Sequence, residues 1–92
     1  MIVYVEVEFI IQTAHSLKEK RAVLQRMITL TKQKFNVSVA EIDFQDVWQR
    51  TRIAVVTVAS AKEAADREMN YALHYLQSNP EWEMLDSWRE YL

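Results

Sequence analysis

The chain opens with an alternating pattern over residues 2–11. One side of the pattern is entirely apolar, with Val3, Val5, Val7, Phe9 and Ile11, and the other side includes Tyr4, Glu6 and Glu8. A period of two that is rich in β-branched residues is typical of a strand with one buried face. The pattern therefore predicts a first strand over residues 2–11.

A helical period replaces this alternation after residue 15. Ser16 and Glu19 form a capping box, in which the Ser16 hydroxyl accepts from the Glu19 N–H and the carboxylate reaches back to the Ser16 N–H. Apolar residues then recur on one face of the helix at steps of three, four and seven: Leu17, Leu24, Met27, Ile28 and Phe35. We expect a helix to about Lys34, with Lys20 near the apolar face and its ammonium reaching out to water.

Three further strands and a second helix follow. The strand over residues 51–59 is apolar on both faces, and the C-terminal strand is weakly patterned but carries Trp82 and Trp88. A second capping box, Ser60 with Glu63, opens the second helix. The predicted ranges are strands over 37–42, 51–59 and within 81–92, and a helix from Ser60 to about Ser78.

The order β-α-β-β-α-β is that of an α+β, ferredoxin-like fold. Right-handed crossovers place both helices on one face of a four-stranded antiparallel sheet and leave the other face open. A chain of this length is expected to form one domain, residues 1–92. Because the third strand is apolar on both sides, the open face could be covered by a second copy in a homodimer. Alternatively, the C-terminal aromatic residues close their own core.

Composition excludes several kinds of chemistry. The chain has no cysteine and no glycine, which removes thiol chemistry, thiolate metal sites and every glycine-dependent phosphate loop. His15 and His74 have no partner at metal-ligand spacing. We therefore expect no catalytic constellation, no cofactor and no metal. The first residues do not resemble a signal peptide and no apolar run could span a bilayer, so we expect a cytoplasmic protein without membrane contact.

Charge is distributed unevenly along the chain. The formal net charge is −2, yet residues 18–34 hold six basic residues against one glutamate, and the chain beyond residue 60 is acidic. The basic arc of the first helix predicts contact with the phosphates of structured RNA, without DNA specificity, through Lys18, Lys20, Arg21 and Arg26. The alternative is a solvated helix face. Base stacking on the open sheet is disfavoured, because Glu6 and Glu8 would repel phosphates.

The predicted hairpin loop before the third strand holds more side-chain functionality than a tight turn needs. Tryptophan and arginine are preferred anchors of interfaces. The loop is therefore a candidate interaction site, formed by Gln45, Asp46, Trp48, Gln49 and Arg50. Alternatively, Trp48 closes the end of the sheet and Arg50 pairs with Glu6, Glu8 or Glu41 across strands.

Three stretches, in this order and spacing, resemble the YlxP-like family of small bacterial proteins of unknown function: Ser16–Arg21, Phe35–Glu41 and Gln45–Arg50. The resemblance implies a ferredoxin-like fold, a cytoplasmic bacterial setting and a connection to ribosome maturation or translation. It marks Lys18, Lys20, Arg21, Gln45, Asp46, Trp48, Gln49 and Arg50. Phe44 replaces a histidine found in some relatives, which argues against a metal or acid–base role there.

Overall fold

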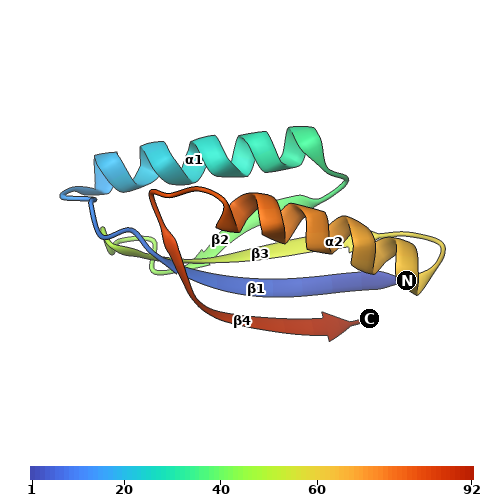
Figure 1. The fold of residues 1–92 in the computed structure, drawn as a ribbon. Coiled ribbons are helices and arrows are strands. Elements are labelled where there is room, and N and C mark those ends of the chain that lie inside the picture. The colour runs from blue at the N-terminus through green and yellow to red at the C-terminus, as the bar shows by residue number, and fades with distance from the viewer.

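The computed structural model describes Met1–Leu92 and confirms the ferredoxin-like α+β fold (Figure 1). The four strands form one antiparallel sheet in the order β2-β3-β1-β4, and α1 and α2 both lie on the same face of it. Neither helix is long and apolar enough to cross a membrane. The elements, in chain order, are β1 (Ile2–Ile10), α1 (Leu17–Lys34), β2 (Ser38–Asp43), β3 (Arg50–Val58), α2 (Lys62–Gln77) and β4 (Glu83–Tyr91).

The two helices begin differently. At α1 the Ser16 hydroxyl accepts from the Glu19 N–H at 3.1 Å, and the Glu19 carboxylate accepts from the His15 N–H at 2.8 Å, one residue earlier than predicted. The second capping box is wrong, because the N-cap of α2 is Ala61 and makes no side-chain hydrogen bond. Ser60 lies one residue too early for its hydroxyl to reach the free N–H groups of the first turn.

The register between β1 and β3 decides which side of β3 is buried. Val5 pairs with Val55, and both side chains point toward the helices. The same face of β3 carries Ile53 and two buried threonines, Thr51 and Thr57. The opposite face carries the remaining apolar residues of the strand, which stay accessible at the open side of the sheet: Ala54, Val56 and Val58.

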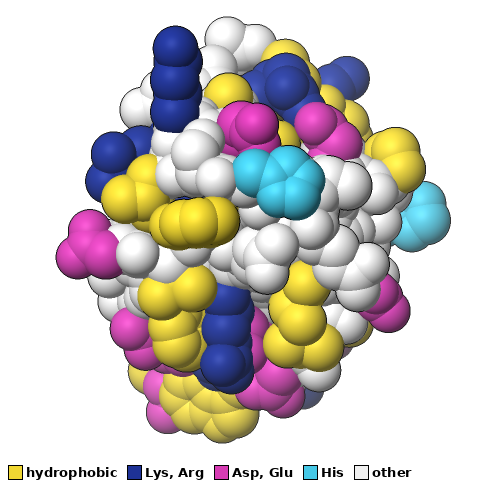
Figure 2. Space-filling model, turned by 90° about the vertical axis from the view of Figure 1, so that its left-hand side faces the viewer, with side chains coloured by type: hydrophobic (Ala, Val, Ile, Leu, Met, Phe, Trp, Pro, Cys, Tyr) yellow, Lys and Arg dark blue, Asp and Glu magenta, His cyan; other side chains and the backbone are white.

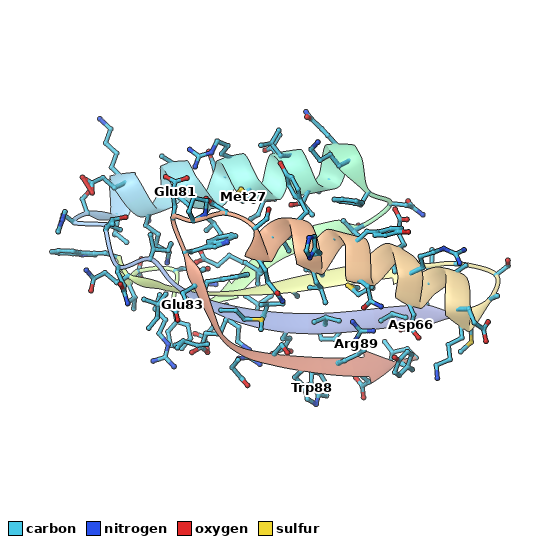
Figure 3. All side chains as sticks on the ribbon, viewed as in Figure 1. Met27, Asp66, Glu81, Glu83, Trp88 and Arg89 are labelled. Carbon is cyan, nitrogen blue, oxygen red and sulfur yellow. The ribbon has the colours of Figure 1, made fainter.

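The C-terminal tryptophans divide between the two faces of the sheet. Trp82 precedes β4 and is buried, with its ring stacked on Phe9 at a centroid distance of 4.1 Å. Its indole N–H donates to the Leu76 carbonyl at 2.6 Å. Trp88 lies on β4, points away from the helices (Figure 3) and is 47% exposed. Trp82 therefore closes the core of its own chain, whereas Trp88 leaves an aromatic ring accessible on the open face of the sheet.

Candidate nucleic-acid interface

The start of α1 and the β2–β3 loop lie at the same end of the molecule, on the left of Figure 1. The Gln49 side-chain amide donates to the carbonyls of Gln12 and Ala14, each at 3.2 Å. The Ile11 N–H donates in turn to the Gln49 carbonyl at 2.9 Å. The structure therefore brings together the two groups of residues that the family resemblance marks.

Lys20 connects these two segments from inside the protein. Its side chain is fully buried, and its ammonium donates to the Phe44 carbonyl and pairs with the Glu41 carboxylate at 3.0 Å. The Thr51 hydroxyl donates to the same Glu41 oxygen at 2.6 Å. The prediction that Lys20 contacts phosphate is wrong: its stem lies on the packed face of α1, and a carboxylate on β2 holds its charge there.

The loop turns at Phe44, whose φ of 64° is in the left-handed region. A residue with a side chain is uncommon in this conformation, and the chain has no glycine to take the position. The Asp43 carboxylate accepts from the Phe44 N–H at 2.8 Å. The Phe44 carbonyl accepts from the Val47 N–H at 3.0 Å as well as from Lys20. These bonds fix the turn from both sides.

The accessible surface of this end combines cations with an aromatic ring (Figure 2). Lys18 and Arg21 are exposed on α1 and form no ion pair, whereas the exposed Arg26 pairs with Glu81. Trp48 is 50% exposed. It lines a shallow open hollow of about 390 Å³ together with its neighbours Asp46, Val47 and Gln49. We call this surface of Lys18, Arg21 and residues 45–49 the loop–helix surface.

Arg50 belongs to the open sheet face rather than to this surface. Its guanidinium donates to the Glu8 carboxylate at 2.8 Å and lies 4.4 Å from the centre of the Phe44 ring. The cross-strand pairing predicted for Arg50 is therefore confirmed, with Glu8 as the carboxylate. The exposed anchor of the loop is therefore Trp48, while Arg50 ties the loop to the sheet.

A network of charges occupies one half of the open sheet face. Arg52 donates to Glu6 at 2.7 Å, to Glu8 at 3.2 Å and to Asp86 at 3.3 Å. The hydrogen bond from Arg52, and then that from the Tyr4 hydroxyl, hold the pKa of Glu6 below its usual 4.5. The same bond to Glu6 raises the pKa of Arg52. Because Arg50 and Arg52 are both already paired with carboxylates, this half of the sheet offers no free cation to a phosphate.

The lowered pKa of Glu6 predicts a loss of stability in acid. Its stabilisation is complete above the unfolded-state pKa, near 4.5, and is lost as pH falls through the lower folded-state pKa. Urea unfolding at about pH 6 and about pH 3 measures the difference, which we expect to be smaller in Glu6→Gln than in the native protein. An equal pH dependence of the two proteins would contradict the assignment to Glu6.

Comparison with solved structures shows the fold alone. The de novo designed protein Foldit4 superposes with a TM-score of 0.60 at 14% identity, covering 100% of this chain and 99% of its own. Another designed protein, LFR1 1, described as having a ferredoxin fold, gives a TM-score of 0.47 at 18% identity, over 98% of this chain and 83% of its own.

No group of three or more histidine, cysteine, aspartate or glutamate side chains is arranged to hold a metal ion.

Sequence comparison shows the family. The chain is 47% identical over 83 residues to the uncharacterized protein YlxP of Bacillus subtilis (strain 168), covering 90% of each chain. The YlxP-like resemblance is thereby confirmed. The family model described as protein of unknown function, DUF503, matches residues 2–89. The chain therefore belongs to the DUF503 family of proteins of unknown function.

Proposed function

We propose that this protein is a cytoplasmic, non-enzymatic accessory factor that binds structured RNA, free or within a ribosomal particle, through the loop–helix surface. The observation that carries the proposal is the placement of two exposed, unpaired cations, Lys18 and Arg21, at the same end of the molecule as the loop that carries the half-exposed ring of Trp48 (Figure 1). Lysine and arginine supply the salt-dependent attraction to phosphates, and an accessible aromatic ring provides a flat surface for an unpaired base.

The spacing of the cations fits contact with a nucleic-acid backbone. Lys18 and Arg21 are three residues apart on α1, so they are neighbours on one side of the helix. Lys32 extends the same basic helix toward its C-terminal end and is also exposed without an ion pair. Contacts of this kind position a protein on RNA without reading its sequence. The connection to ribosome maturation or translation that the family resemblance implies supports the same class of partner.

The way in which the ionisable side chains are paired favours a binding role over a catalytic one. Where charged groups converge, they neutralise one another: Lys20 pairs with Glu41, and Arg52 with Glu6 and Glu8. A catalytic acid or base needs a proton-transfer partner on a substrate, within reach of an accessible pocket. The hollow beside Trp48 is lined by a single acidic side chain, that of Asp46.

Charge reversal of the two cations tests the proposal. We expect Lys18→Glu with Arg21→Glu to raise the Kd for a structured RNA hairpin and for ribosomal subunits by about tenfold or more. The slope of log K against the logarithm of the salt concentration should become shallower by about one for each cation removed. Filter binding and sucrose-gradient sedimentation at low and high salt measure both quantities.

The matched control makes the same charge change on α2, where Lys62 and Arg67 are also exposed. Lys62→Glu with Arg67→Glu should leave the Kd within about twofold, because both positions lie outside the loop–helix surface. Trp48→Ala should weaken binding while preserving its salt dependence, since a stacking contact releases no counterion. Equal binding by the native protein and the Lys18 and Arg21 variant would disprove the proposal.

A further inference from the structure

The open face of the sheet divides into an apolar half and a charged half. At one end Val58, Ile2 and Leu92 lie side by side on β3, β1 and the chain end after β4. The next row on this face joins Val56 and Tyr4 in the middle of the sheet, with the polar Ser38 and Glu90 at its two edges. Beyond the middle of the sheet the charge network follows, with Arg52, Glu8 and Asp86 abreast on β3, β1 and β4.

The apolar half is accessible to an unusual degree. Val58 and Leu92 are each more than half exposed, and Trp88 stands at its border with its ring edge-on to Tyr4 at a centroid distance of 6.0 Å. Scattered apolar residues are normal on a protein surface, but a contiguous apolar patch marks a site that something else covers. The helices lie on the other face, so no part of this chain covers the patch (Figure 1).

We propose that a second copy of this chain covers the open face, with the two sheets packed face to face about a two-fold axis parallel to the strands. Aligned sheets pack about 10 Å apart, with strand directions within roughly 30° of each other. This axis keeps the apolar half opposite the apolar half of the other copy. A two-fold axis in the same plane but across the strands would instead press each apolar half onto a charged half.

The distribution of side-chain size fits this symmetry. The rotation exchanges the two edges of the sheet, so that β4 of one copy lies over β2 of the other. Cross-strand pairing places Ala40, Ala54, Glu6 and Trp88 in one row across the sheet. The largest side chain of the row is therefore opposite Ala40 of the second copy, where the small side chain leaves room for the indole. An isologous interface makes this contact twice.

The distribution of charge fits as well. The same rotation places β1 over β3, so Glu8 of one copy lies opposite Arg52 of the other, and the contact is again reciprocal. Asp86 and Asp43 come opposite each other only at the sheet edges. Both are exposed there, so water and salt screen their repulsion. Opposite charges thus meet near the axis, and like charges meet only at the rim.

The face is large enough for a stable interface. β1, β3 and β4 have nine residues each and are therefore roughly 30 Å long, and four strands span roughly 19 Å. The flat area is up to roughly 600 Å², and protruding side chains raise the accessible area toward the roughly 800 Å² per partner of a standard interface. The rotation also keeps the two loop–helix surfaces at the same end of the dimer, on outward sides.

Sedimentation equilibrium over a range of protein concentrations tests the dimer without any RNA, so its outcome is independent of the proposed function. We expect a dimer that persists in high salt, because salt does not screen the contacts between the two apolar halves. Trp88→Glu should raise the dimer Kd by about a hundredfold or more. Ala40→Glu should do the same without altering a packed core, since Ala40 is exposed on an edge strand.

Tyr71→Glu is the matched control, because Tyr71 is 57% exposed on α2 and far from the open sheet face. Its dimer Kd should equal that of the native protein. A native protein that remains monomeric at concentrations near a millimolar would overturn the proposal. So would a dimer that persists unchanged in both Trp88→Glu and Ala40→Glu.

Discussion

Replacing Lys20 with alanine is expected to lower the free energy of unfolding by about 3–5 kcal/mol, which is the usual cost of removing one partner of a buried ion pair. The ammonium of Lys20 is the cation that faces the Glu41 carboxylate, whose side chain is only 15% exposed. Its loss leaves that charge uncompensated, removes a donor from the Phe44 carbonyl and empties the space of a fully buried side chain. Chemical denaturation followed by circular dichroism measures the change.

The adjacent residue provides the control for this effect. Arg21 lies on the same turn of α1 but is exposed and forms no ion pair, so Arg21→Ala should change stability by no more than about 0.5 kcal/mol. Lys20→Met combined with Glu41→Gln should lose less than Lys20→Met alone, because the pair is removed together and the glutamine oxygen can still accept from Thr51. A Lys20→Ala variant as stable as Arg21→Ala would refute the buried ion pair.

The consequence for function is indirect but measurable. Lys20 belongs to the stretch that the family resemblance marks, yet its ammonium faces inward and holds the loop that presents Trp48. Its loss should therefore increase hydrogen exchange at the amides of residues 43–49, in addition to the global destabilisation. Lys18 and Arg21 lie exposed on the outside of the same helix turn, where the proposed function places the contact with RNA. Composition alone does not separate the buried member of this short basic motif from the exposed ones.

The fold was predictable because local patterns and topology agree. The alternation in β1, the helical period after Ser16 and the short connections leave few arrangements other than the observed order of strands. The side of β3 that is buried was not predictable. Val56 and Val58 are as apolar as Ile53 and Val55, so the alternation carries no information, and only pairing with β1 decides the matter.

The candidate site was only half predictable, for a similar reason. The prediction that the Lys20 ammonium reaches water is wrong, because the register of β2 on β3 places Glu41 where it pairs with that ammonium inside the protein. The contact between the loop and α1 rests on bonds from the Gln49 side chain to backbone carbonyls. Any residue supplies such a carbonyl, so the residues at those positions contain no signal for the contact.

Replacing Trp82 with alanine is the second change for which we expect a large loss, about 3–5 kcal/mol of unfolding free energy. Its ring stacks on Phe9, a fully buried residue of β1, and its indole N–H satisfies the carbonyl of Leu76 near the end of α2. Trp82→Phe should cost less, about 1–3 kcal/mol, because it retains an aromatic ring but leaves that carbonyl without its donor. Urea unfolding of each variant gives both values.

Trp88 is the informative comparison, because it has the same side chain on the other face of the sheet. In a monomer, Trp88→Ala should cost far less than Trp82→Ala, since the ring is half exposed and lies edge-on to Tyr4 rather than stacked in the core. In a dimer its contribution adds through mass action and grows with protein concentration, whereas that of Trp82 does not. A large loss for Trp88→Ala at the lowest concentrations would mean that the chain itself buries this ring. A loss that grows with concentration would place the ring between two copies.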